Sequence, residues 1–179
     1  MLSELLSMAG LAGRVCTGLV FVFAASDKIL HWRVLEGVIG NYHLLPSAMI
    51  RPVTYLLPPV ELAIGCALLS GMVPVPAAAC GMALQLLFAV AMAVNIRRGR
   101  HFIDCGCHRS FLRQTLRPAL VVRNLILTAM LAPSLFWLQI PSGGASIGLA
   151  AGIVLFLFYL LGNTIAALPG FDAAPEHSA

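Results

Sequence analysis

The stretch AAACGMALQLLFAVAMAVNI, residues 77–96, decides the class of fold. It carries no charged side chain, and it is as long as the ~20 apolar residues that a helix needs to cross a bilayer. The whole chain has 60% hydrophobic and only 10% charged residues, with a mean hydropathy of +0.93. A soluble domain carries about 25% charged residues. The composition therefore predicts an integral membrane protein.

Similar apolar stretches lie on both sides of this one. We predict an all-α, integral membrane bundle of four to five transmembrane helices. It forms a single multi-pass domain over residues 1–170, followed by a short polar tail at 171–179. The expected spans are 11–30, 53–72, 77–96, 118–138 and 147–168. Between the first two spans the sequence is amphipathic, which predicts a loop with a short interfacial helix.

The first apolar stretch is interpreted as a membrane span and not as a cleaved signal peptide. Its opening residues, MLSELLSMAG, lack the Lys or Arg of a signal-peptide start.

Positive charge is concentrated in two of the connecting segments. The net charge is +4, and the segments around 28–51 and 97–117 hold most of the basic residues. Because cytoplasmic loops collect Lys and Arg, both segments are expected in the cytoplasm, with the N-terminus outside. The same pattern favours contact with membrane lipid over nucleic acid, which is not expected as a partner.

The segment HFIDCGCHRS, residues 101–110, contains the strongest candidate for chemistry. Cys105 and Cys107 can close a small, strained disulfide ring, and strain makes a disulfide easier to reduce. Gly106 tolerates the unusual backbone torsions that closure requires. Arg109 favours the thiolate, and Asp104 is a candidate proton acceptor or partner for Arg109. These residues suit thiol–disulfide exchange, with no cofactor expected.

Two other interpretations of this segment stay open. The cysteines can be incidental, or they can bind zinc together with His101 and His108. One residue between two cysteines is tighter than the usual zinc spacing, so no metal site is predicted.

Cys66 and Cys80 are secondary redox candidates. They lie equally far from Val73 in the short turn between the second and third spans, so an antiparallel hairpin brings them to the same depth. Cysteine is also a common small packing residue between membrane helices, and that interpretation stays open.

Glu61 and Arg123 are ionisable residues expected inside the membrane, where a charge is costly and marks function by default. They lie at a similar depth in the second and fourth spans, so we expect them to pair. Whether such a pair is structural or handles a substrate or proton stays open. Lys28 is expected to be an interfacial anchor. Three amides are candidates to join a network around Glu61: Gln85, Asn95 and Asn124.

Several of these elements together resemble one known family. ASDKILHW at 25–32, PPVELAIGCALLSG at 58–71, NIRRGRHFIDCGC at 95–107 and VRNLIL at 122–127 are similar to the methylamine-utilisation MauE family, which is related to the DoxX-like membrane proteins. The resemblance covers roughly residues 15–130. Its most specific part is Asp104 to Cys107, whereas Lys28, Pro46 and Glu61 match less distinctive positions.

The resemblance implies a protein of the bacterial inner membrane that supports maturation of methylamine dehydrogenase. The small subunit of that enzyme carries several disulfides, and family members are associated with a thioredoxin-like periplasmic protein of the MauD type. Cys105 and Cys107 are then expected to act in thiol–disulfide exchange with this partner. Two alternatives remain: a non-catalytic membrane scaffold for the partner, or a small-molecule or ion carrier centred on Glu61.

Overall fold

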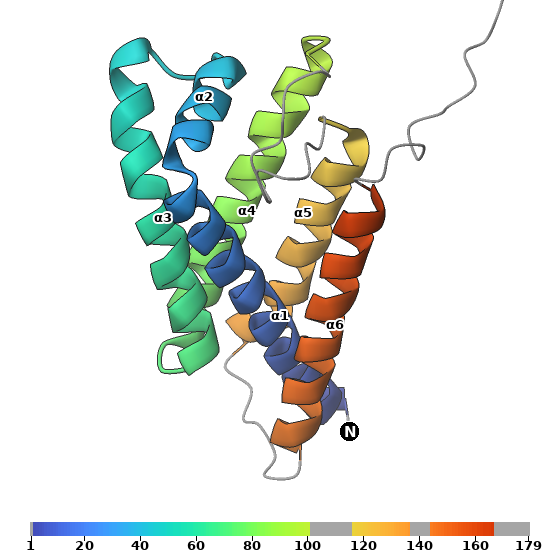
Figure 1. The fold of residues 1–179 in the computed structure, drawn as a ribbon. Helices are drawn as coiled ribbons and strands as arrows, with labels where there is room; N and C mark the ends of the chain where they lie inside the picture. The colour runs from blue at the N-terminus through green and yellow to red at the C-terminus, as the bar shows by residue number, and fades with distance from the viewer. Residues whose placement is uncertain (1, 101–115, 137–143, 167–179) are drawn as a thin grey trace, which may run out of the picture.

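The computed structural model describes residues 2–100, 116–136 and 144–166, and these parts of the chain are helical apart from short turns (Figure 1). The elements, in chain order, are α1 (Leu2–Leu30), α2 (Trp32–Tyr42), α3 (Ser47–Ser70), α4 (Pro74–Arg97), α5 (Pro118–Leu131), the short 3₁₀ helix η1 (Ala132–Leu135) and α6 (Gly144–Ala166). Five of these segments are long and apolar enough to cross a membrane, α5 counted together with η1. The all-α membrane bundle predicted from composition is confirmed.

Proline and glycine set several of the helix ends. Pro74 and Pro118 stand in the first turn of α4 and α5, where their missing N–H is not needed. α3 ends at Gly71, whose φ of 65° lies in the left-handed region that glycine adopts without strain. Pro133 lies just after Leu131, where the α-helical part of the fourth span gives way to η1.

Two helices begin well before the expected bounds. α1 begins at Leu2 instead of near residue 11, and α3 begins at Ser47 instead of near Val53. α3 also continues through Pro52, Pro58 and Pro59 as one helix. The amphipathic segment before it contains the short helix α2. The tail expected at 171–179 lies outside the described residues.

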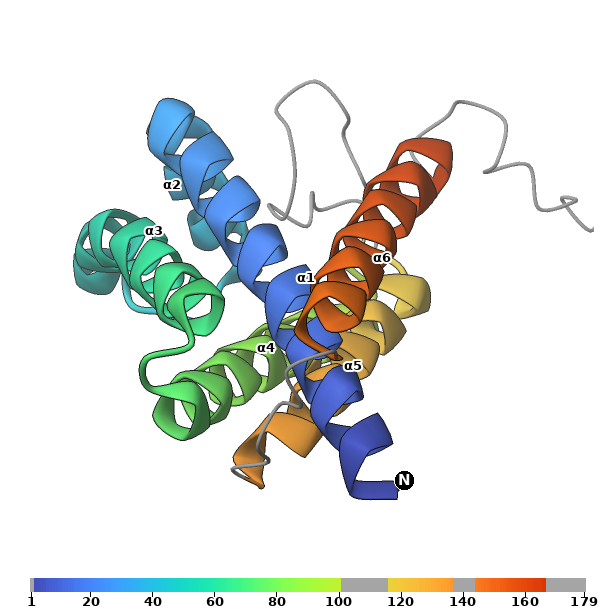
Figure 2. The same ribbon diagram turned by 90° about the horizontal axis from the view of Figure 1, so that it is seen from below.

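α1 runs through the centre of the bundle and packs against α3, α5 and α6 (Figure 2). Small residues permit these close crossings. A Cβ added at Gly65 on α3 would lie 3.0 Å from the carbonyl oxygen of Gly18 on α1, and one at Gly152 on α6 would lie 2.6 Å from the Cβ of Val15. Such small-residue contacts are typical of helix packing in lipid, where no hydrophobic effect drives helices together.

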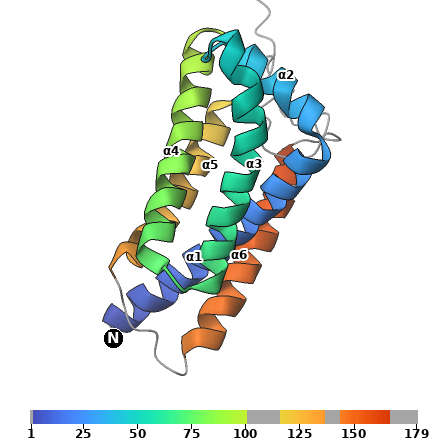
Figure 3. The same ribbon diagram turned by 90° about the vertical axis from the view of Figure 1, so that its left-hand side faces the viewer.

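The two ends of the bundle differ in what they carry. α2, the start of α3 and the end of α4 lie at one end, and the α3–α4 turn and the N-terminus lie at the other (Figures 1 and 3). The described residues of the two basic segments therefore share one end, which we call the basic end. Their side of the membrane stays a prediction.

Candidate functional site

The cysteine pair that is expected to carry out thiol–disulfide exchange is not among the described residues. Cys105, Cys107, Asp104, Gly106 and Arg109 all fall in 101–115, outside the part of the chain that the structure describes. The residues that flank this segment are placed at the basic end.

The described residues on either side of this segment, Arg100 and Leu116, contact α4 and α5. The backbone N–H of Arg100 donates to the carbonyl oxygen of Asn95, at 3.1 Å, so the chain is still attached to the last turn of α4. Leu116 is fully buried, and it packs in one cluster with Met92 of α4 and Leu120 of α5. Arg100 and Leu116, the described residues on either side of the segment with Cys105 and Cys107, therefore both lie at the basic end.

A buried ion pair joins α1 and α3 near this end. The ammonium of Lys28 donates to Oε1 of Glu61. Lys28 is 7% exposed and Glu61 is 0% exposed. A buried charge without its counter-charge would be strongly destabilising, so each group makes the position of the other tolerable.

This pair corrects two expectations from the sequence. Lys28 is buried inside the bundle and does not act as an interfacial anchor. Glu61 pairs with Lys28, although its expected partner was Arg123. The depth argument failed because it treated the helices as parallel rods, whereas the long helix α1 crosses the bundle obliquely (Figure 2).

Arg123 is held by the last helix of the chain. Its Nη1 donates to Oδ1 of Asn163 at 2.8 Å, and its guanidinium lies 5.5 Å from the ring centroid of Tyr159. Both partners belong to α6. Arg123 therefore fastens α5 to α6, and the side chain of Asn163 is a partner that sequence reasoning missed.

The three amides expected beside Glu61 are all buried, on α4 and α5. Asn95 donates from Nδ2 to the carbonyl oxygen of Ala91 in its own helix, at 3.0 Å. Within the described ranges, Oδ1 of Asn95 and Nδ2 of Asn124 have no hydrogen-bond partner. These hydrogen bonds do not join Gln85, Asn95 or Asn124 to Glu61, so the expected network stays a prediction.

The remaining cysteines lie away from the basic end. Among the described residues, Cys16, Cys66 and Cys80 form no disulfide; Cys16 is buried and the other two are exposed. Cys66 lies in the last part of α3 and Cys80 in the first part of α4, on either side of the α3–α4 turn. Both cysteines therefore lie toward the end of the bundle that is opposite the basic end. Their redox role stays a prediction.

The described ranges contain no group of three or more His, Cys, Asp or Glu side chains that could hold a metal ion. The four ligands of the alternative zinc interpretation lie in the segment 101–115, which this finding does not cover.

Taken together, the five spans and the buried ion pair define a multi-pass helical membrane protein with a polar interior. Comparison with known proteins gives the family. The family model described as "Methylamine utilisation protein MauE" matches residues 6–140. The chain therefore belongs to the MauE family, as the resemblance predicted.

Curated relatives agree with this assignment over nearly their whole length. "Methylamine utilization protein MauE" of Paracoccus denitrificans is 39% identical over 166 residues, which cover 90% of this chain and 89% of the relative. The protein of the same name from Paracoccus versutus is 40% identical, covering 84% of this chain and 83% of the relative. The one from Methylorubrum extorquens is 38% identical, covering 85% and 88%. No solved structure matches the chain.

Proposed function

We propose that this protein handles thiols and disulfides in the bacterial inner membrane during maturation of methylamine dehydrogenase. Its membership in a family of methylamine utilisation proteins is the observation that carries the proposal. The proposed partners are a thioredoxin-like periplasmic protein and the small subunit of the dehydrogenase.

The proposed reaction centre is the Cys105–Cys107 pair. In its disulfide form, a thiolate of the thioredoxin-like partner attacks one sulfur, a mixed disulfide forms, and the second partner thiolate then resolves it. The partner leaves as a disulfide and the Cys105–Cys107 pair is left as a dithiol. Two electrons and two protons have moved from the partner to this protein, and the partner can oxidise the next pair of thiols in the dehydrogenase subunit.

Substitution of the two cysteines tests this reaction centre. We expect Cys105→Ser and Cys107→Ser, alone and together, to leave the protein expressed and inserted while active methylamine dehydrogenase is lost. The measurement is dehydrogenase activity and the thiol content of its small subunit, in cells that carry each variant as the only copy. Cys16→Ser is the matched control, because Cys16 is buried and unbonded in α1. Normal maturation in the double variant would remove the redox role and leave the scaffold alternative.

The position of the partner relative to the cysteine pair has two solutions. In the first, segment 101–115 faces the periplasm and exchanges directly with the partner. In the second, it faces the cytoplasm as its charge predicts, and the exposed Cys66 and Cys80 meet the partner at the opposite end. The hydrocarbon core is ~30 Å thick, and thiol exchange requires contact between sulfurs. The second solution therefore needs an electron carrier between the two pairs.

A cross-linking experiment separates the two solutions. A partner variant that lacks its resolving cysteine traps the mixed disulfide. Direct exchange predicts that the trapped bond is made to Cys105 or Cys107, whereas the relay predicts Cys66 or Cys80. A mixed disulfide that still forms when all four of these cysteines are changed to serine would contradict both solutions.

A further inference from the structure

A cavity of about 320 Å³ lies at the basic end, between α1, α2, α3 and α4. This volume falls in the range of small-molecule binding sites, which is ~300–1,000 Å³. Among the described residues, its walls are apolar side chains except for Lys28 and Tyr42, and they include Leu57 of α3 and Ala91 of α4. Such walls select an occupant with an apolar body.

The cavity is bordered by apolar side chains that are exposed. Leu44, Leu45 and Leu87 line it, and each of them is also exposed on the outside of the bundle. All three side chains are apolar, so among the described residues this part of the rim presents no polar side chain to a molecule that arrives dissolved in the bilayer. The occupant is therefore expected to be lipid-soluble.

Lys28 is the charged group among the described residues of the cavity wall, and its pairing with Glu61 limits what it can bind. An ammonium carries three N–H donors, and one of them is directed to Glu61. The charge of Lys28 is already compensated by that carboxylate. An anionic head group would add a second negative charge beside Glu61, whereas a neutral carbonyl oxygen can accept a further hydrogen bond without this cost.

Aromatic side chains favour a flat occupant. Phe88 lines the cavity, and the ammonium of Lys28 lies 5.1 Å from the centroid of its ring. Tyr42 lies on another wall. A planar ring with carbonyl oxygens can pack against these rings while it accepts a hydrogen bond from Nζ of Lys28.

We propose that this cavity binds the ring of a membrane quinone, with one ring carbonyl accepting a hydrogen bond from Lys28. The chemical class combines the three properties that the walls require: an apolar body, a flat ring and neutral oxygen acceptors. The isoprenoid chain of such a molecule leaves past Leu44, Leu45 and Leu87 into the lipid.

The position of the cavity suits the bound quinone to accept electrons from the cysteine pair, a role that rests on the proposed function. Leu116, the first described residue after the cysteine segment, packs in a cluster that includes Tyr42, Phe88 and Met92, all of which line the cavity. Oxidation of the Cys105–Cys107 dithiol releases two electrons and two protons as the S–S bond forms. The quinone takes up both electrons and both protons and leaves as the quinol, which restores the disulfide for the next turnover.

Binding can be tested without the thiol chemistry. The Cys105→Ser/Cys107→Ser variant is reconstituted in phospholipid nanodiscs and titrated with decylubiquinone, with tryptophan fluorescence as the measurement. We expect saturable quenching. Ala91→Leu fills the cavity and should weaken binding at least tenfold, whereas Ala79→Leu, the same change at an exposed position of α4, should not.

A second variant removes the donor and keeps the interior neutral. Lys28→Met/Glu61→Leu takes away both charges, so no unpaired carboxylate is left to disturb folding. It should weaken decylubiquinone binding by a similar factor. Saturable binding that neither variant weakens, absence of saturable binding, or tighter competing binding of decanoate would overturn the proposal; the last result would indicate an anionic lipid site.

The electron step has its own measurement. Reduced wild-type protein in the same nanodiscs should lose two thiols for each quinol formed, and Ala91→Leu should slow this loss. If decylubiquinone binds as predicted but no thiols are lost, the quinone site stands and its role as electron acceptor is wrong. If maturation fails to depend on the cysteines, the binding result is unaffected, because it is obtained without them.

Discussion

At the scale of single residues, the Lys28–Glu61 pair is the feature that most constrains this protein. Both side chains are buried in the bundle interior. Removing one partner takes this contact away from the other charge in a medium of low dielectric constant, whereas removing both leaves two apolar side chains. The double change is therefore expected to destabilise the protein much less than the single change.

We predict that Lys28→Met lowers the free energy of unfolding by about 3–5 kcal/mol, the usual cost of breaking a buried pair. Lys28→Met/Glu61→Leu should recover most of that loss. The measurement is reversible denaturant unfolding of the purified protein in detergent. Arg33→Met serves as the control, since it removes an exposed cation from neighbouring α2. A double variant as unstable as the single one would show that the pair is not the cause.

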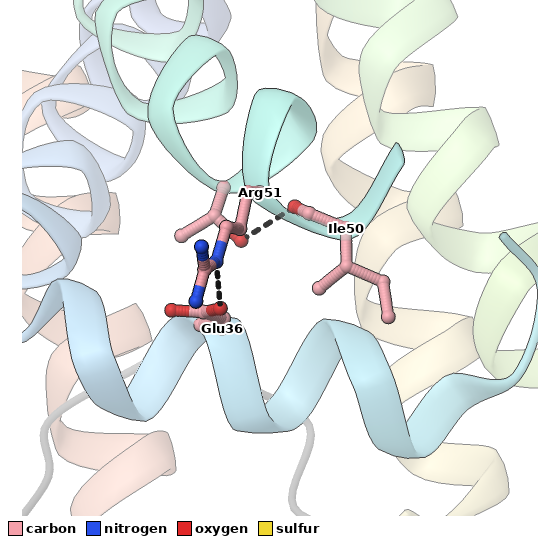
Figure 4. Close-up of polar contacts among 4 residues, drawn as sticks. Glu36, Ile50 and Arg51 are labelled. Carbon is pink, nitrogen blue, oxygen red and sulfur yellow. Dashed lines mark hydrogen bonds and ion pairs between the residues drawn. The ribbon is translucent and has the colours of Figure 1, made fainter. Parts of the chain in front are cut away.

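An exposed pair at the same end gives a contrasting expectation. Arg51 Nε lies 3.2 Å from Glu36 Oε1 and connects the first turns of α3 to α2 (Figure 4). The Arg51 side chain is 79% exposed, so water and salt screen the attraction. Glu36→Gln should therefore change the free energy of unfolding by less than about 1 kcal/mol. A loss as large as that of Lys28→Met in the same denaturant assay would contradict this.

At the scale of elements, the contact between α1 and α6 depends on the absence of side-chain atoms. A Cβ at Gly152 would lie 2.6 Å from the Cβ of Val15 and 2.9 Å from the carbonyl oxygen of Ala12. The second contact involves backbone, which cannot move aside without shifting a helix. Gly162, further along α6, has no described atom within 4 Å of its added Cβ apart from its own stretch of helix.

These two glycines form a matched test of the helix contact. We expect Gly152→Ala to lower the free energy of unfolding by about 1–3 kcal/mol, the usual cost of overpacking. Gly162→Ala should be neutral or slightly stabilising, because alanine is the better helix former. Thermal unfolding in one detergent compares them. Equal effects of the two changes would mean that α6 does not pack on α1 as the structure describes.

The presence of the long helices was predictable from sequence because the membrane interior allows very few backbone structures. A backbone that crosses hydrocarbon must satisfy its own hydrogen bonds, and a helix of ~20 apolar residues does so. Helix ends were less predictable. Apolar content marks where a helix enters lipid, whereas α1 and α3 continue beyond that point, to Leu2 and Ser47.

The partner of a buried charge could not be derived from the same information. Residue depth can be estimated by counting from a turn, but helix rotation and crossing angle are set by packing across the bundle. The sequence therefore indicated that Glu61 lies inside the membrane. It did not indicate that Lys28 pairs with Glu61, or that Asn163 pairs with Arg123. The cavity beside Lys28 was missed for the same reason, since four helices contribute its walls.

At the scale of the whole molecule, the arrangement of charge predicts how the bundle sits in the membrane. Among the described residues, the cations other than Lys28 in and around α2, the start of α3, the end of α4 and the start of α5 are Arg33, Arg51, Arg97, Arg98, Arg100 and Arg117. The α3–α4 turn at the other end, residues 71–73, carries no charge. Translocating the basic end would be unfavourable, so we predict that it is cytoplasmic.

Single reporter cysteines can measure this orientation directly. In a variant with all five native cysteines changed to serine, Met72→Cys places a thiol at the α3–α4 turn, where Met72 is 83% exposed. Asn41→Cys places one on the exposed side of α2 at the basic end. A membrane-impermeant maleimide added to intact spheroplasts should label position 72, and it should label position 41 only after lysis. The reverse pattern would put Cys105 and Cys107 on the periplasmic side, where direct exchange with the thioredoxin-like partner needs no relay.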